Sequence, residues 1–143
     1  EDWVIATGTT TSVRDFVRMA FAQTGITLRF EGTGVDETGI IDHIDIGVYL
    51  KAIKKESANE KPLNGKHMPK VGQVVVKVDP HYFRPTEVDL LIGDASKAKN
   101  KLSWIPEYNL EALIQEMMQS DLHLMTKGVY LREGGYAVNN YYE

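Results

Sequence analysis

A strand–helix–strand pattern over residues 1–30 is the feature that most constrains the fold of this chain. Residues 3–7 form an aromatic and β-branched run that predicts a buried strand. Residues 12–25 predict an amphipathic helix, because the apolar residues there recur three and four positions apart. Residues 26–30 predict a second short strand, and the three elements together favour an α/β layer.

The ends of this first helix carry recognisable capping residues. Ser12 is the expected N-cap, and Asp15 three positions later resembles the acidic partner of a capping box. Gly25 is the expected stop, because glycine readily adopts the left-handed conformation that closes helices.

The middle of the chain is the least regular part. Residues 46–53 predict a short helix with one apolar face. Otherwise we expect residues 38–72 to be an insertion, with a mobile surface loop over residues 54–70, where lysines alternate with proline and glycine. A lid or a partner-binding loop is the alternative interpretation of this stretch.

The second half of the chain returns to regular patterns. Residues 73–79 are rich in valine and predict a strand. Asp94 is the expected N-cap of a helix over residues 95–102, and Asn109 of a longer helix that ends near residue 125. We expect residues 127–143, rich in tyrosine and glycine, to be a C-terminal extension of one single domain, residues 1–143.

Composition excludes several classes of protein. With 143 residues, 43% hydrophobic and 25% charged, the chain is neither disordered nor membrane-spanning. A net charge of −4 argues against a nucleic-acid-binding protein, and we expect no membrane partner. The absence of cysteine excludes disulfides and thiolate nucleophiles and fits a cytoplasmic protein. Because the chain opens on Glu1 rather than Met, we expect a fragment.

The sequence lacks the usual cofactor and metal motifs. No GxGxxG turn lies between a strand and a helix, and there is no P-loop, so we expect no cofactor-binding residues. The four histidines show no HExxH pattern. His43 lies between Asp42 and Asp45, a group that we interpret as solvated charge, so we expect no metal site.

The best candidate site is the tetrapeptide that begins at Arg84. Pro85 restricts the backbone of Arg84 to an extended conformation, which can project the guanidinium outward. That guanidinium can bind a diphosphate through two hydrogen bonds, while Glu87 can accept hydrogen bonds from the vicinal hydroxyls of a ribose. An ion pair between Arg84 and Glu87 within the protein is the alternative.

Several segments of the chain form a recognisable series when they are taken together and in order. They are residues 1–8, 12–17, 28–34, 78–88, 93–99 and 102–106, with the helix of residues 110–122 behind them. This series resembles the GDP-mannose 4,6-dehydratases. The resemblance covers residues 1–34 and 75–125 and includes the Arg-Pro-Thr-Glu tetrapeptide.

This resemblance implies a fold and a reaction. Family members are extended short-chain dehydrogenase/reductase proteins, with an N-terminal Rossmann half that binds NADP and a smaller α/β C-terminal half that binds the sugar nucleotide. The reaction, a hydro-lyase reaction, oxidises GDP-mannose at C4, eliminates water across C5 and C6, and returns hydride to C6. The product, GDP-4-keto-6-deoxymannose, is a precursor of GDP-fucose.

For this chain the resemblance implies a substrate-binding domain without a Rossmann half and without catalytic residues. Arg84 would contact the diphosphate of GDP-mannose or GDP, and Glu87 the ribose hydroxyls. The parent enzyme would be a homo-oligomer in nucleotide-sugar metabolism, and the isolated chain would be inactive. The alternatives are a freestanding nucleotide-sugar-binding or regulatory module and a protein-interaction domain without catalysis.

Overall fold

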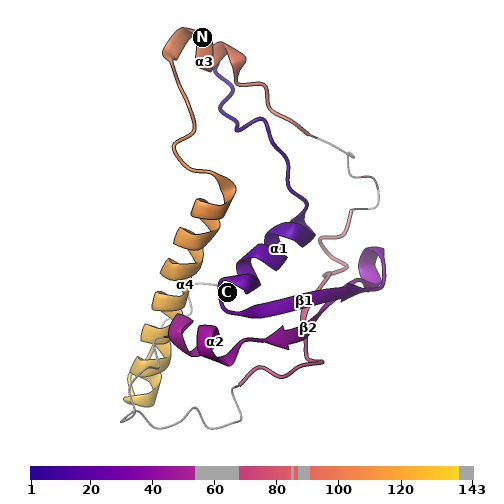
Figure 1. Ribbon diagram of the computed structural model, residues 1–143, viewed down its shortest axis with the longest axis vertical. Coiled ribbons are helices and arrows are strands. Elements are labelled where there is room, and N and C mark those ends of the chain that lie inside the picture. The colour runs from indigo at the N-terminus through magenta and orange to yellow at the C-terminus, as the bar shows by residue number, and fades with distance from the viewer. Residues whose placement is uncertain (54–67, 85, 87–90, 139–143) are drawn as a thin grey trace.

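In this computed structural model, the described residues form five helical segments and one small sheet (Figure 1). The structure describes residues 1–53, 68–84, 86 and 91–138. The elements in chain order are α1 (Val13–Ala22), β1 (Ile26–Glu31), the short 3-10 helix η1 (Gly34–Asp36), β2 (Thr38–Ile44), α2 (Ile46–Ala52), β3 (Val74–Lys77), α3 (Ser96–Leu102) and α4 (Leu110–Glu133).

The sheet has three strands in the order β1–β2–β3, and both pairings are antiparallel. Register irregularities fall between Thr27 and Leu28 in the first pairing and between Gly39 and Ile40 in the second. Such bulges interrupt the strict alternation of inward and outward side chains. The described residues form a small fold of mixed helices and strands. That this fold belongs to the short-chain dehydrogenase/reductase proteins stays a prediction.

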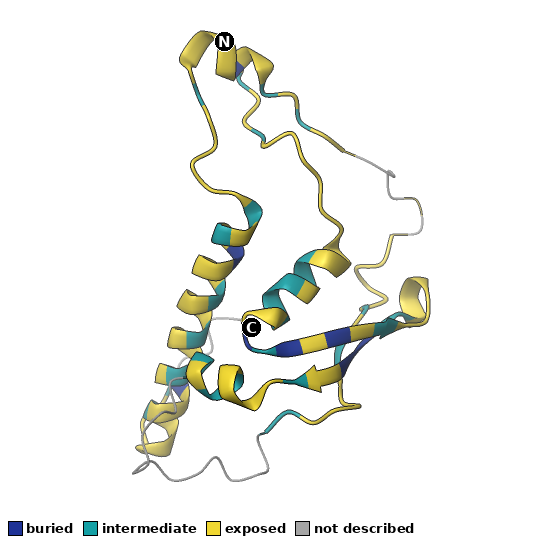
Figure 2. Cartoon of the chain, in the orientation of Figure 1, coloured by how far each residue is buried: buried dark blue, intermediate teal, exposed yellow. Residues whose placement is uncertain are grey.

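The core lies between α1 and one face of the sheet. Ile26, Leu28 and Ile41 form its buried centre, and Val17 and Phe21 of α1 pack against them. Figure 2 shows burial concentrated in β1 and β2. Burying one such aliphatic side chain stabilises a fold by about 1.5–3 kcal/mol. We call α1, the three strands and α2 the sheet body.

The other face of the sheet carries the charged side chain of Arg29. Arg29 on β1 makes an ion pair with Glu31 and lies 3.5 Å (Nε to Oδ1) from Asp42 on β2. Its neighbour Leu28 is buried, so Arg29 faces away from the core.

The predicted first helix is confirmed together with its caps. The Ser12 hydroxyl accepts the Asp15 backbone N–H at 3.1 Å and donates to the Asp15 carboxylate at 2.7 Å. These hydrogen bonds hold the pKa of the Asp15 carboxyl below its ordinary value, with Arg18 contributing in the same direction. Gly25 has a φ of +72°, as its stop position requires.

The predicted strand at residues 3–7 is wrong. The segment is extended but belongs to no sheet. It lies instead along α3, where Lys97 Nζ donates to the Asp2 carbonyl at 2.9 Å and stands 4.8 Å from the centre of the Trp3 ring. A strand needs a hydrogen-bonded neighbouring strand; Gly93 lies beside this segment, but no strand among the described residues pairs with it. We call residues 1–8 and 91–106 the α3 region.

Two segments are more regular than the sequence analysis expects. The expected insertion, residues 38–72, contains the central strand β2 and the helix α2. The apolar pattern at residues 46–53 predicts this helix. The expected mobile loop falls largely on residues 54–67, which lie outside the described residues. Helix α4 continues to Glu133, well into the expected extension of residues 127–143. Gly128 lies inside this helix and is buried.

The remaining predicted elements are confirmed with shifted ends. Strand β3 is shorter than predicted. Helix α3 begins one residue late, so its N-cap is Ala95 and the prediction of Asp94 is wrong; the Asp94 side chain accepts the N–H of Ser96 at 2.9 Å. Asn109 caps α4 by accepting the N–H of Ala112 at 2.8 Å. Helix α4 contacts α1, while α3 lies at the far end of the molecule (Figure 1).

Candidate functional site

A tight turn after β3 leads the chain into the candidate site. The side chain of Asp79 accepts the N–H of His81 at 2.9 Å, and its carbonyl accepts the N–H groups of Tyr82 at 3.0 Å and Phe83 at 3.1 Å. An Asp side chain that bonds two residues ahead is a common way to stabilise a turn. The turn fixes the direction in which Phe83 and the next residue, Arg84, leave the sheet.

Phe83 rests on the connection between β1 and β2. A Cβ atom built on Gly34, the first residue of η1, would lie 3.5 Å from Cζ of the Phe83 ring. Gly34 has a φ of +60°, which glycine adopts without strain. The chain after β3 therefore lies against the end of the β1–β2 hairpin before it continues toward α3 (Figure 1).

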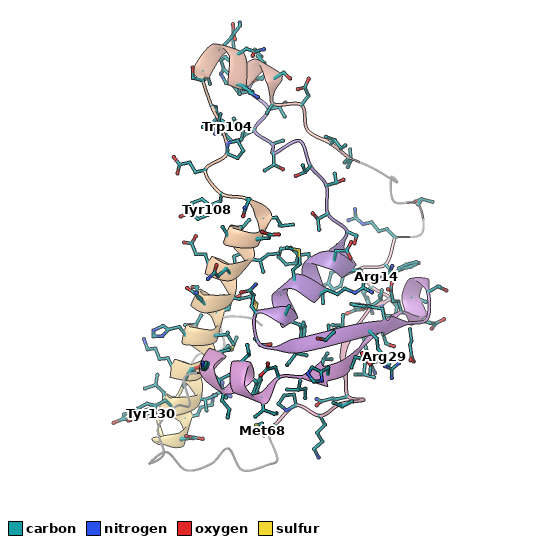
Figure 3. All side chains as sticks on the ribbon, in the orientation of Figure 1. Arg14, Arg29, Met68, Trp104, Tyr108 and Tyr130 are labelled. Carbon is teal, nitrogen blue, oxygen red and sulfur yellow. The ribbon has the colours of Figure 1, made fainter. Side chains whose placement is uncertain are left out.

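The same hairpin end is tied to α1 by an ion pair. Arg14, in the first turn of α1, donates from Nε to Oε1 of Glu37 at 2.6 Å. This hydrogen bond lowers the pKa of the Glu37 carboxyl and raises that of the Arg14 guanidinium. Arg14 also stands 5.8 Å from the centre of the Phe30 ring, over which Arg18 lies at 5.0 Å. Figure 3 shows Arg14 at the start of α1, beside the hairpin.

Three segments thus meet at one end of the sheet: the first turn of α1, the β1–β2 connection and the turn after β3. We call this meeting point the hairpin-end site; its members are Arg14, Gly34, Glu37, Phe83 and Arg84. The Arg84 side chain is exposed and has an interaction within the protein. Glu87, its predicted companion, lies outside the described residues.

Sequence reasoning singled out Arg84 but missed Arg14 and Glu37. Their pairing spans 23 residues of chain, and no local pattern signals such a contact. The only sequence signal was the position of Arg14 in the first helical turn, where a cation is electrostatically unfavourable unless another group compensates it.

The expected solvated charges near His43 have structural partners. Asp42 lies beside Arg29, and Asp45 caps α2 by accepting the N–H of Val48 at 3.0 Å. Among the residues that the structure describes, no group of three potential metal ligands lies together. Of the described helices, none is both long and apolar enough to cross a bilayer.

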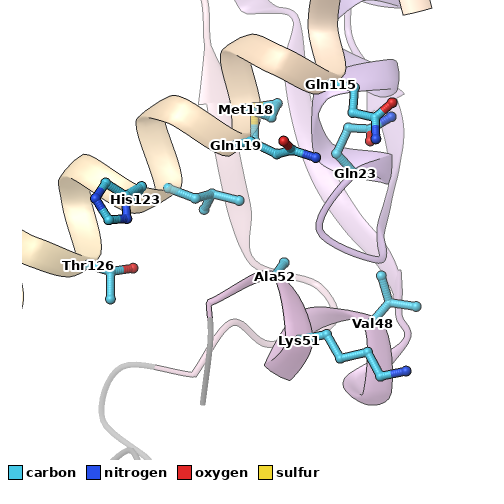
Figure 4. A pocket seen from close by; sticks show the side chains of 10 residues that line it. Gln23, Val48, Lys51, Ala52, Gln115, Met118, Gln119, His123 and Thr126 are labelled. Carbon is cyan, nitrogen blue, oxygen red and sulfur yellow. The ribbon is translucent and has the colours of Figure 1, made fainter. Parts of the chain in front are cut away.

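A separate groove of about 400 Å³ lies between α2 and α4 (Figure 4). Lys51 and His123 stand on opposite walls, and Met118 and Leu122 are the apolar residues that α4 contributes. The groove belongs to different elements from those of the hairpin-end site.

Comparison with known proteins identifies the family. The sequence model of the family described as GDP-mannose 4,6 dehydratase matches residues 1–117. The chain belongs to the GDP-mannose 4,6-dehydratase family. The match takes in all members of the hairpin-end site, and it ends inside α4.

Individual relatives extend the match. The GDP-mannose 4,6-dehydratase of Yersinia enterocolitica is 42% identical over 139 residues, which cover 97% of this chain and 33% of that protein. That of Vibrio cholerae is 43% identical over 138 residues, or 96% of this chain and 32% of the relative. The Drosophila melanogaster relative is 41% identical over 126 residues, 88% of this chain and 25% of its own length. The chain therefore spans about a third or less of these dehydratases.

Proposed function

We propose that this chain is the C-terminal, sugar-nucleotide-binding part of a GDP-mannose 4,6-dehydratase, the enzyme that converts GDP-mannose to GDP-4-keto-6-deoxymannose. The observation that carries the proposal is the match of the family model to residues 1–117, which include Arg84 and the elements that hold it. Relatives named for this activity occur in bacteria and in animals, which supports a conserved substrate.

In this proposal Arg84 binds the diphosphate of GDP-mannose. A guanidinium offers five N–H donors in a planar fork that matches two phosphate oxygens. The turn at Asp79 and the contact of Phe83 with Gly34 restrict the position of Arg84, so less conformational entropy is lost when the substrate binds. Glu87, three residues later, is proposed to accept hydrogen bonds from the ribose hydroxyls.

NADP is proposed to bind to the part of the enzyme outside this chain. A dinucleotide turn joins a strand to a helix within a parallel strand–helix–strand unit. The pairings among the described strands are all antiparallel, and the segment before α1 is unpaired, so these residues do not fit the cofactor. We accordingly propose that the isolated chain is inactive and that the complete enzyme is a cytoplasmic homo-oligomer that supplies GDP-fucose synthesis.

The test is substitution of Arg84 in the full-length enzyme. Arg84→Ala should lower kcat/KM for GDP-mannose at least ~10-fold, since a hydrogen bond to a charged group contributes roughly 1.5–3 kcal/mol. Arg132→Ala, which removes an exposed arginine from the last turn of α4, is the matched control and should leave the kinetics unchanged. Equal kinetics for Arg84→Ala and wild type would remove Arg84 from the substrate site.

A second test concerns the proposal that the chemistry belongs to the part of the enzyme outside this chain. The isolated chain, incubated with NADP⁺ and GDP-mannose, should form no 4-keto product. Product formation by this chain alone would contradict the assignment of the chemistry to the rest of the enzyme.

A further inference from the structure

Arg14 connects two elements that the rest of the hairpin-end site depends on. Its Nε donates to Glu37 at 2.6 Å, and the N–H of Glu37 in turn donates to the Gly34 carbonyl at 3.3 Å, which closes η1. The ion pair therefore anchors the η1 turn to the first turn of α1. About half of the Arg14 side chain is exposed, but only 19% of the Glu37 side chain is, so Glu37 is the more covered partner of the pair.

The turn that Glu37 closes is the surface on which Phe83 rests. The Phe83 ring lies beside Gly34, because a Cβ built on this glycine would be 3.5 Å from Cζ of the ring. Arg84 follows Phe83 directly in the chain. Hydrogen bonds thus join Arg14 to Glu37 and Glu37 to Gly34, and Phe83, the residue before Arg84, lies beside Gly34.

A role in stability alone accounts poorly for this arrangement. Exposed ion pairs contribute only about 0.2–1 kcal/mol to folding. Arg18, one turn along α1, also lies over Phe30 and pairs with Asp15 on its own helix at 3.1 Å. Arg18 thus provides a comparable surface pair, but only Arg14 reaches the β1–β2 connection.

We propose that Arg14 is a positioning residue for diphosphate binding, acting through Glu37, Gly34 and Phe83 on Arg84. This inference rests on the proposed function. It assigns Arg14 no contact with the substrate: its removal loosens η1, Phe83 loses its support, and Arg84 samples positions from which it does not reach the phosphates. The loss therefore concerns substrate affinity and leaves the chemical step intact.

A double-mutant cycle in the full-length enzyme tests the inference. Arg14→Ala should raise KM for GDP-mannose roughly five-fold, because the interaction free energies of coupled residues correspond to changes of about this size. The value of kcat should stay within about two-fold of wild type. Glu37→Gln should also raise KM for GDP-mannose, and it provides a second variant if Arg14→Ala folds poorly. Arg18→Ala is the matched control and should leave KM within about two-fold of wild type. The Arg14→Ala, Arg84→Ala double variant should be no worse than Arg84→Ala alone.

The outcomes separate the two proposals. If Arg84→Ala leaves the kinetics unchanged, the proposed function of Arg84 fails. If Arg84→Ala weakens binding while Arg14→Ala behaves like Arg18→Ala, the function stands and the positioning role is overturned. Additive losses in the double variant would also overturn it, because they would show that Arg14 acts independently of Arg84.

Discussion

The sheet body and the α3 region use similar apolar sequences with opposite results. In the sheet body Ile41 is fully buried, on a central strand with neighbours on both sides. In the α3 region Ile5 is 57% exposed and Leu91 79% exposed, and Ala98 is the one buried hydrophobic residue there among those the structure describes. The sheet body has backbone partners and a covering helix, whereas the α3 region consists of an extended segment laid along a two-turn helix.

The comparison shows that a β-branched, aromatic run does not by itself make a strand. Residues 3–7 have a strong strand pattern, yet no described strand pairs with them. Residues 38–44 mix isoleucine with Gly39, Asp42 and His43, and they form the central strand because β1 and β3 pair with both edges. The available partners decide the outcome more than the intrinsic preference does.

The largest effect is expected in the sheet body. Ile41→Ala should lower the free energy of unfolding by about 2–5 kcal/mol, because the lost methyl groups leave a cavity in a closed core. Leu91→Ala, at an exposed position of the α3 region, should change it by less than about 0.5 kcal/mol. Urea denaturation of the two variants measures both. Equal losses would contradict the distinction between the two regions.

A smaller and local effect is expected in the α3 region. A Cβ at Gly93 would lie 2.6 Å from Cβ of Ala6, which is closer than two carbon atoms that are not bonded to each other can approach. Gly93→Ala should displace the N-terminal segment at a cost of about 1–3 kcal/mol. Hydrogen exchange should accelerate at residues 3–6 and stay unchanged in β2. Unchanged exchange at residues 3–6 would show that this segment does not pack on Gly93.

The cap of α4, which joins the two regions, should have an effect of about 1 kcal/mol. Asn109→Ala removes the side-chain acceptor of the Ala112 N–H. The thermal midpoint should fall by a few degrees, whereas Asn109→Asp, which retains an acceptor, should preserve it. A midpoint that Asn109→Ala leaves in place would mean that α4 begins elsewhere.

The smallest expected effect is a pH dependence that belongs to the sheet body. The pKa of Glu37 lies below its ordinary value of 4.5, chiefly because of the hydrogen bond from Arg14. A carboxyl with a lowered folded-state pKa stabilises the fold above its unfolded value, and this contribution is lost as the pH falls through the folded value. Glu37→Gln should therefore flatten the loss of stability below pH 4.5, measured by urea titration across that range. An unchanged acid slope would contradict the pairing with Arg14.

Local signals explain what the sequence could predict. The caps at Ser12 and Asn109 and the spacing of apolar residues locate both long helices, because these interactions lie within one or two turns. The Arg84 candidate comes from a contiguous tetrapeptide and a family resemblance, and its role stays a prediction. Glu87 lies outside the described residues, so its role is likewise a proposal.

Long-range contacts explain what the sequence could not predict. The pairing of Arg14 with Glu37 depends on how α1 folds back over the sheet. The bulge between Gly39 and Ile40 hides the strand period of β2. Helix α4 continues through the buried Gly128 to Glu133, beyond the end near residue 125 that the sequence predicts.

Hydrogen exchange of the full-length enzyme with and without GDP tests the central claim most directly. Binding at the hairpin-end site should slow exchange at residues 79–84 and at the η1 turn, while α2 and the second half of α4 should exchange as before. Protection confined to the groove between α2 and α4, or no protection of these segments at saturating GDP, would contradict the account.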